Sequence, residues 1–180
     1  MATEEIVLPI TEPETEWVRG RALQKVNPTR RHARLQMEFG SALNAWSKGI
    51  GEVGLEWRFL IAPPGEVRRP LVPDLTFVRN ERLRGLPADA LETPRFAPDV
   101  AIEIRSPGDH EPDVADKVAI YLAAGTALVI VVDPDGRTAR LSDENGTRTL
   151  GVEDALEHDA LPGFRLPLRE LFATLELPAG

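Results

Sequence analysis

The chain has 180 residues, of which 42% are hydrophobic and 28% are charged, as expected for one soluble globular domain. It contains no cysteine, which excludes a disulfide framework, a thiolate nucleophile and a cysteine-ligated zinc site. The formal net charge of −8 argues against a protein that coats nucleic acid by bulk positive charge.

The N-terminal residues do not resemble a secretion signal. Residues 1–9 include two glutamates and lack a basic start followed by an apolar run. The longest apolar run, residues 127–132, is far too short to span a bilayer, so we expect a cytoplasmic protein without a membrane partner. Residues 1–16 are rich in Glu, Thr and Pro. We expect them to form a flexible arm before a single domain over residues 17–180.

A basic stretch follows this arm, without any acidic residue between Trp17 and Met37. One interpretation is a local basic face that meets DNA phosphates. The other is a solvated helix face, and the sequence leaves both open. The basic residues are Arg19, Arg21, Lys25, Arg30, Arg31 and Arg34, of which Arg30, Arg31 and Arg34 are the candidates for holding the DNA backbone.

The first half of the domain contains one expected helix and two expected strands. Thr29 suits the N-cap of a helix that ends before Gly49 and Gly51. Alternating apolar residues predict one strand over residues 53–61, and a second short strand is expected over residues 71–78. The helix is predicted from apolar residues at three- and four-residue spacing, namely Leu35, Phe39, Ala42, Leu43 and Trp46.

The second half predicts a mixed sheet flanked by helices, which is an α/β (α+β) fold with an edge hairpin. Its continuous apolar run at 127–132 is typical of a central strand that is buried on both faces. The other expected elements are a helical turn near 89–92, a strand at 99–106, a helix at 113–124, a hairpin of 138–142 with 147–150, a short strand at 164–168 and a short helix at 169–175.

Two carboxylates lie inside otherwise apolar expected strands. Asp74 follows Leu71-Val72-Pro73, and Glu103 is flanked by isoleucines on both sides. A carboxylate among aliphatic strand residues is desolvated, and two on neighbouring strands repel each other unless a cation lies between them. Hard cations such as Mg²⁺ and Mn²⁺ prefer oxygen ligands, so the pair is a candidate metal site. The alternative for each is a carboxylate that faces solvent or pairs with an arginine.

Lys117 is the third candidate. Asp113, Lys117 and Tyr121 follow one another at four-residue spacing on the expected helix after Glu103, so they share one face. That face can bring the Lys117 ammonium beside the metal, with Asp113 and Tyr121 in support. The alternative is a surface pair of Asp113 with Lys117, which is common and almost neutral in energy.

These residues resemble a known nuclease pattern. Pro73-Asp74 followed by Glu103-Ile104-Arg105 resembles the signature of the PD-(D/E)xK nuclease superfamily. The run from Pro98 to Pro107 is similar to a bacterial family of restriction-endonuclease-like proteins. Further matches are Asp116-Lys117, Tyr121, Gly125 and Val131-Val132-Asp133-Pro134, and the similarity extends from Glu16-Trp17 through Pro162-Gly163 to Glu170-Leu171-Phe172.

The resemblance implies a restriction-endonuclease-like sheet on which Asp74 and Glu103 hold Mg²⁺ or Mn²⁺, with the Ile104 carbonyl as a further ligand. The signature lysine falls at Arg105, which can stabilise phosphate charge but cannot act as a general base. In the resembling family the lysine often comes from the following helix, which favours Lys117. The resemblance also implies a homodimer.

Several other residues are candidates for the site. Glu38 on the first helix and Glu56 on the first long strand are candidates for a further acid. His32 could contact phosphate, but an exposed helix histidine is the expectation. His110 and His158 lack ligand spacing, and the chain has no HExxH, P-loop, GxGxxG or GxSxG pattern. A nucleotide cofactor is therefore not expected.

The sequence thus predicts a metal-dependent endonuclease that hydrolyses DNA phosphodiester bonds, with Asp74, Glu103, Lys117 and Arg105 as catalytic candidates. Weakly specific or structure-selective cleavage is expected, because the chain leaves little room for a dedicated recognition element. Two alternatives stay open. One is a catalytically silent relative that binds DNA or a protein, and the other is a phosphodiesterase that acts on a small nucleotide.

Overall fold

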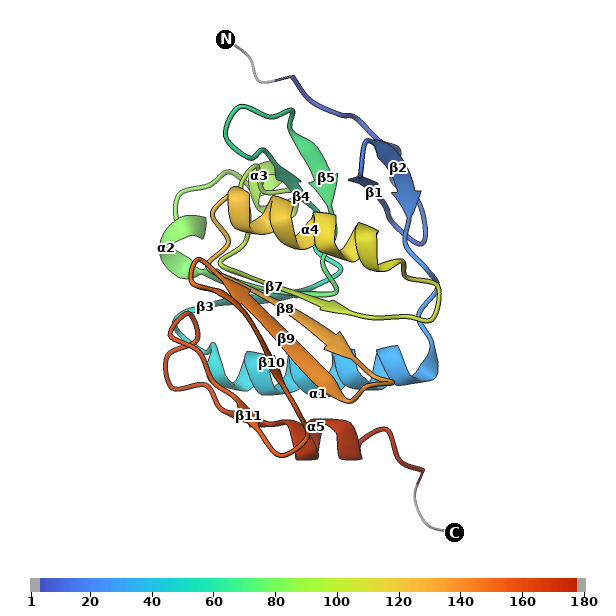
Figure 1. Ribbon diagram of the computed structural model, residues 1–180. Helices are drawn as coiled ribbons and strands as arrows, with labels where there is room; N and C mark the ends of the chain where they lie inside the picture. The colour runs from blue at the N-terminus through green and yellow to red at the C-terminus, as the bar shows by residue number, and fades with distance from the viewer. Residues whose placement is uncertain (1–3, 178–180) are drawn as a thin grey trace.

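A six-stranded mixed sheet forms the centre of the molecule, with strand order β10-β9-β8-β7-β6-β3 (Figure 1). The computed structural model describes residues 4–177. The β7–β8 pair is parallel, and the other four neighbouring pairs of this sheet are antiparallel. The strands are β3 (Gly51–Leu55), β6 (Leu75–Arg79), β7 (Val100–Ile104), β8 (Leu128–Asp133), β9 (Thr138–Asp143) and β10 (Gly146–Leu150).

Helices cover both faces of this sheet (Figure 1). Helices α1 (Arg30–Trp46) and α5 (Leu168–Ala173) lie on one face, and α4 (Glu111–Ala123) lies on the other, where it connects the parallel strands β7 and β8. The expected mixed sheet with flanking helices and an edge hairpin is therefore confirmed. Within residues 4–177, no helix is long and apolar enough to cross a membrane.

Small elements complete the fold. On the α4 side lie two two-stranded sheets (Figure 1), β1 (Thr15–Val18) with β2 (Arg21–Gln24) and β4 (Phe59–Ile61) with β5 (Arg69–Leu71). The remaining elements are α2 (Asn80–Leu83), α3 (Ala88–Glu92), β11 (Ala155–Leu156) and β12 (Leu166–Pro167).

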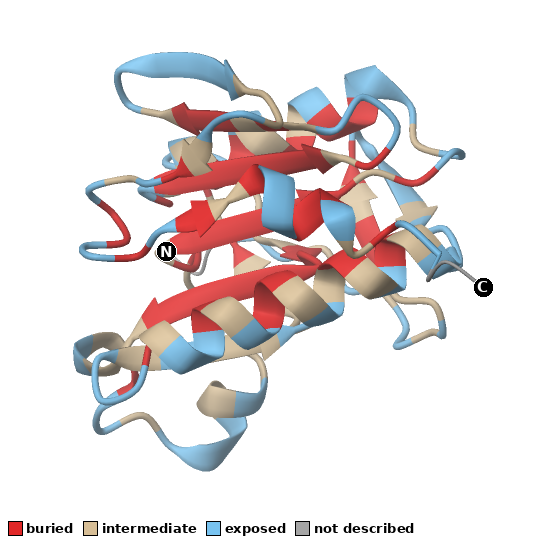
Figure 2. Cartoon of the chain, turned by 90° about the horizontal axis from the view of Figure 1, so that it is seen from below, coloured by how far each residue is buried: buried red, intermediate tan, exposed pale blue. Residues whose placement is uncertain are grey.

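The hydrophobic core has two layers, one on each face of the central sheet. Figure 2 shows burial concentrated in the strands of that sheet. In β7, Val100, Ile102 and Ile104 belong to the layer under α1, whereas Ala101 belongs to the layer under α4. Glu103 alternates with these residues and therefore shares the α4 side with Ala101. The period-two expectation for this strand is confirmed.

Helix α1 follows the sequence prediction closely. The Thr29 hydroxyl accepts a hydrogen bond from the His32 backbone N–H at 3.3 Å, as an N-cap does. The helix ends at Trp46, and Gly49 adopts a φ of 84° in the turn that follows. The buried face of α1 includes Leu35, Phe39 and Leu43, which pack against the sheet.

The expected strand over residues 53–61 is wrong. The chain leaves the central sheet after Leu55, and Glu56 adopts a left-handed φ of 49°. Residues 59–61 then pair with β5 in a separate sheet. The apolar residues continue to alternate through this turn, so periodicity alone does not reveal the break. The expected strand at 71–78 is interrupted in the same way between β5 and β6.

The N-terminal boundary expected at residue 16 falls inside strand β1. Glu5 forms a parallel bridge with Arg68, and the Glu16 side chain is buried. β1 and β2 form a hairpin whose turn residues, Arg19 and Gly20, have φ values of 49° and 72°. Two successive left-handed residues characterise a type I′ turn, in which glycine is favoured. Glu5 and Glu16, near either end of the expected arm, thus contact the domain.

Candidate active site

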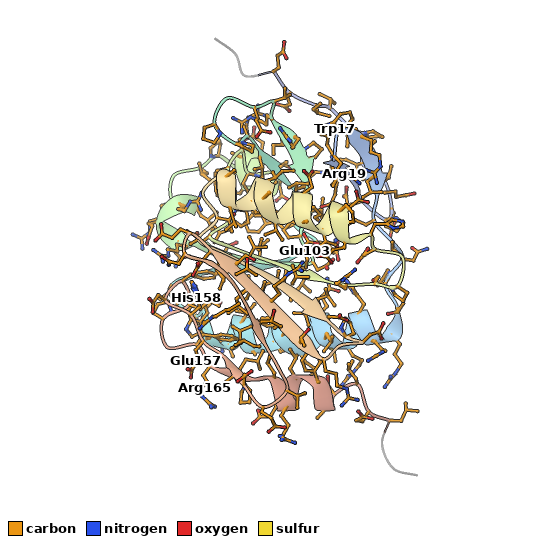
Figure 3. The ribbon with its side chains drawn as sticks, in the orientation of Figure 1. Trp17, Arg19, Glu103, Glu157, His158 and Arg165 are labelled. Carbon is orange, nitrogen blue, oxygen red and sulfur yellow. The ribbon has the colours of Figure 1, made fainter. Side chains whose placement is uncertain are left out.

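A cavity of about 740 Å³ lies beside the ends of β6 and β7, and it collects most of the residues that the sequence singled out. Elements from across the chain contribute to it, and Figure 3 shows Glu103 between α4 and the central sheet. The charged and polar residues lining it include Glu16, Lys25, His32, Gln36, Glu56, Asp74, Glu103, Arg105, Asp113 and Lys117.

Asp74 lies immediately before β6, one step beyond the pairing of Leu75 with Ile102. Its Oδ2 accepts a hydrogen bond from the Ile104 backbone N–H at 2.6 Å, so the carboxylate continues the ladder where the chain turns away. Burial opposes ionisation, but the Lys25 ammonium and the hydrogen bond with His32 outweigh it and hold the pKa of Asp74 below its ordinary value. Asp74 is therefore a carboxylate at neutral pH.

Glu103 and Lys117 form a buried hydrogen-bonded pair. The Lys117 Nζ donates to Glu103 Oε2 at 2.6 Å, and the Tyr121 hydroxyl donates to Glu103 Oε1 at 3.2 Å. Burial raises the pKa of Glu103 to about 8, with Asp74 and Glu16 reinforcing it against the opposing Lys117 charge. Asp113, Lys117 and Tyr121 are all buried on α4. The alternative that Asp113 and Lys117 form a surface pair is therefore wrong.

Glu16 is a site residue that the sequence analysis missed. Its Oε2 accepts from Lys117 Nζ at 2.9 Å, and its Oε1 accepts from the Val72 backbone N–H at 2.7 Å. Burial lowers the pKa of Lys117, but the charges of Glu103 and Glu16 raise it by more. The pKa of Lys117 is therefore above its ordinary value. The ammonium therefore stays charged between the two glutamates. The available signal was the Arg19-Gly20 hairpin turn, which predicts a strand containing Glu16.

Lys25 is the second missed residue. It follows β2, and its Nζ donates to Asp74 Oδ1 at 2.7 Å, to Glu56 Oε2 at 2.5 Å and to the Val72 carbonyl at 2.9 Å. Gln36 donates from α1 to Glu56 Oε1 and to the Asp74 carbonyl, both at 2.9 Å. Glu56, a candidate acid in the sequence, thus lines the cavity.

The expectation that His32 is exposed is wrong. The residue is 5% exposed, and its Nε2 lies 3.2 Å from Asp74 Oδ2. Its Nδ1 is buried without a hydrogen-bond partner among the described residues. The sequence contained a signal for this burial, because His32 lies three residues before Leu35 and seven before Phe39, on the apolar face of α1.

Two other candidates have partners outside the carboxylate cluster. Arg105 lines the cavity, but its guanidinium pairs with Glu111 at 2.9 Å. Glu38 pairs with Arg34 at 3.0 Å on the surface of α1 and is not among the described residues that line the cavity. Glu38 as a further metal ligand stays a prediction, which would require its carboxylate to leave Arg34.

The basic stretch does not form one continuous free surface. Arg30 donates to the Leu175 carbonyl at 3.2 Å, Arg31 pairs with Asp135 and with the Pro134 carbonyl, and Arg34 pairs with Glu38. Arg19, labelled at the β1–β2 hairpin in Figure 3, and Arg21 at the start of β2 both pair with Asp113. A hydrogen bond from Arg21 lowers the pKa of Asp113. These contacts favour a structural interpretation for the stretch, and contact with DNA stays a prediction.

The donor chemistry of the cavity fits a hard divalent cation. Four carboxylates face two ammonium groups, so negative charge is in excess when all are ionised. Among residues 4–177, no group of three or more His, Asp or Glu side chains is already arranged as a cage. Mg²⁺ commonly binds through one or two carboxylates and retains several waters, so a pair such as Asp74 and Glu103, with the Ile104 carbonyl, suffices. The four carboxylates are Glu16, Glu56, Asp74 and Glu103, and the two ammonium groups are Lys25 and Lys117.

A comparison with solved structures supports the fold described above. A crystal structure described as a "putative nuclease belonging to DUF820" from Anabaena variabilis matches with a TM-score of 0.83 and 26% sequence identity, over 94% of this chain and 95% of that chain. The shared architecture confirms the expected restriction-endonuclease-like fold. A comparison with curated proteins found no match.

The family comparison covers almost the whole domain. Residues 6–169 match the model of the Uma2 family, which is described as "Putative restriction endonuclease". The match includes Asp74, Glu103 and Lys117, and together with the structural neighbour it indicates a nuclease-like function. The chain belongs to the Uma2 family of restriction-endonuclease-like proteins.

Proposed function

We propose that this protein is a metal-dependent endonuclease that hydrolyses phosphodiester bonds of DNA. The observation that supports the proposal best is the convergence of Asp74 and Glu103 with a buried Lys117 ammonium at one cavity. Bound Mg²⁺ or Mn²⁺ would lower the pKa of a water and polarise the phosphodiester. Asp74 and Glu103 would hold the metal, with the Ile104 backbone carbonyl as a further oxygen donor.

The remaining residues would position groups and balance charge. Lys117 stays cationic and can stabilise negative charge that develops on a phosphate oxygen in the transition state. Tyr121 is fully buried, and its pKa is raised well above the ordinary value, so its hydroxyl keeps its proton and orients Glu103. Arg105 lies at the cavity, where it can bind a phosphate once Glu111 releases it.

The test is cleavage of plasmid, duplex and single-stranded DNA with Mn²⁺, Mg²⁺ or EDTA. We expect Asp74→Asn, Glu103→Gln and Lys117→Met each to lose cleavage by roughly 100-fold or more, in line with the loss of one transition-state contact. Asp135→Asn is the matched control, because this carboxylate is exposed and pairs with Arg31 outside the cavity. Cleavage that survives in both Asp74→Asn and Glu103→Gln would refute the proposed site.

One observation favours a second candidate, a silent DNA- or protein-binding relative. Lys25 and Lys117 already bind Asp74 and Glu103, so both proposed metal ligands have a cationic partner without a metal. Absence of cutting on every DNA substrate, together with absence of Mn²⁺ binding in calorimetry, would support this candidate. Activity on a small phosphodiester combined with little salt-dependent DNA affinity would instead support a small-nucleotide phosphodiesterase.

A further inference from the structure

Lys25 is the charged group of the cavity that the proposed reaction leaves without a role. The chain contains three lysines, Lys25, Lys48 and Lys117. Lys48 is exposed after α1, whereas Lys117 is buried and Lys25 is only 13% exposed in its side chain. The two lysines in the cavity reach it from different elements and bind different carboxylates, so their roles are separable.

The Lys25 ammonium is surrounded by oxygen atoms. It donates to Asp74 Oδ1 at 2.7 Å, to Glu56 Oε2 at 2.5 Å and to the Val72 carbonyl at 2.9 Å. These three acceptors match the three hydrogens of an ammonium group. Burial lowers the pKa of Lys25, but Asp74, Glu16, Glu103 and Glu56 together raise it above the ordinary value. Lys25 is therefore a permanent cation in the middle of the carboxylates.

Two carboxylates and a backbone carbonyl are also the donors that a hard divalent cation prefers. The other oxygen of Asp74, Oδ2, is already bound by the Ile104 N–H at 2.6 Å and lies 3.2 Å from His32 Nε2. Oδ1 is thus the Asp74 oxygen that faces a cation, and Lys25 covers it. A metal that binds Asp74 through Oδ1 has to displace the Lys25 ammonium. Otherwise the two cations bind the same oxygen and repel each other.

We propose that Lys25 is a tethered competitor of the divalent metal. Its ammonium occupies the cation position beside Asp74 when the metal is absent and moves toward Glu56 and the open cavity when the metal binds. Glu56 is suited to receive it, because its side chain is 42% exposed and already contacts Lys25. This competition raises the metal concentration that is needed to occupy the site. The inference rests on the proposed function.

The test measures Mn²⁺ binding by isothermal titration calorimetry on the full chain without DNA. Lys25→Met removes the competing charge and keeps most of the side-chain volume, so we expect it to tighten Mn²⁺ binding at least about fivefold, the lower end of typical coupling between two ligands. Lys48→Met is the matched control, since the same substitution outside the cavity should leave the affinity unchanged. Lys25→Gln, which keeps a hydrogen-bond donor for Asp74, replaces Lys25→Met if that variant does not fold.

The double variant Asp74→Asn/Lys25→Met should lose the gain, because the competition takes place at Asp74. Wild-type binding that depends on Asp74, with equal or weaker binding in both Lys25 variants, would overturn the inference and leave the metal site standing. No Mn²⁺ binding in the wild type or in any Lys25 variant would overturn the inference together with the metal-dependent function.

Discussion

At the scale of single residues, the cavity shows how burial and charge set opposite protonation tendencies for two neighbouring carboxyls. Asp74 accepts hydrogen bonds from a backbone N–H and from Lys25, and its pKa is lowered despite burial. Burial raises the pKa of Glu103 to about 8, and the nearby carboxylates of Asp74 and Glu16 reinforce this shift against the opposing charge of Lys117. The difference follows from the partners of each group and not from its depth.

This contrast predicts a pH dependence of stability in metal-free protein. The folded chain keeps the Glu103 proton up to about pH 8, whereas the unfolded chain loses it near the ordinary value of 4.5. The folded state binds more protons over this range, so the contribution of Glu103 to stability is present at low pH and is lost as the pH rises toward 8. The slope for one proton is at most about 1.4 kcal/mol per pH unit.

Urea unfolding in EDTA at pH 5, 6.5 and 8 checks this. We expect the free energy of unfolding of the wild type, relative to Glu103→Gln, to fall as the pH rises, because glutamine cannot titrate. The other shifted groups of the cavity have pKa values that move away from this window. A constant difference between the two proteins from pH 5 to 8 would show that Glu103 has an ordinary pKa.

At the scale of elements, the site depends on how the β1–β2 hairpin and α1 are attached to the sheet. The hairpin supplies Glu16 from one strand and Lys25 just beyond the other, and α1 supplies His32 and Gln36. These elements enclose the ends of β6 and β7, where Asp74 and Glu103 lie. Displacement of the hairpin would separate Asp74 from Lys25 and Lys117 from Glu16, whereas displacement of α1 would remove the contacts of His32 and Gln36 with Asp74.

The start of β3 provides an element-scale prediction. A Cβ added to Gly51 would lie 2.3 Å from Phe77 Cε2 and 2.4 Å from the Val78 carbonyl, which is closer than real contacts allow. Gly51→Ala should therefore destabilise the protein by roughly 1–3 kcal/mol, the usual cost of overpacking, measured by urea unfolding. Gly151→Ala is the control, since its nearest contact would be 3.8 Å from Asp154 Oδ2. Equal stability of both variants would mean that β3 lies further from β6 than described.

At the scale of the whole molecule, metal binding should stabilise the fold, because the proposed ligands come from separate segments of the chain. With Mn²⁺ at 100 times its dissociation constant, the free energy of unfolding should rise by about 2.7 kcal/mol. For a chain of this size this corresponds to a rise in the melting temperature of roughly 5–10 °C. Differential scanning fluorimetry should show this rise for the wild type and not for Asp74→Asn. A similar rise in both proteins would assign the effect to Mn²⁺ bound elsewhere.

The expected homodimer stays a prediction about the assembly. Cleavage of both strands of a duplex is served by two copies of the active site, which a two-fold dimer provides. Light scattering coupled to size-exclusion chromatography should then give about twice the chain mass of 19.8 kDa. A mass near 19.8 kDa, with or without Mn²⁺, would contradict the dimer and favour nicking of single strands.

Much of the fold could be predicted from local sequence patterns. The period-two apolar residues of β7, the continuous apolar run of β8 and the capped amphipathic α1 each indicate their own burial, because side-chain periodicity reflects which face an element hides. Asp74 and Glu103 were recognisable as polar residues in apolar strands, and Lys117 by its place on the next helix. The break between strands at Glu56 could not be predicted, since the apolar residues alternate in the same way on both sides of it.

The sequence by itself determined the mixed sheet, its covering helices and the first three residues of the candidate site. Only the tertiary structure decided that Glu16, Lys25 and His32 join them, that Glu38 pairs with Arg34, and that Arg105 turns to Glu111. The physical reason is that these contacts join segments far apart in the chain. A side chain's charge partner depends on which elements pack together, and no local spacing encodes that.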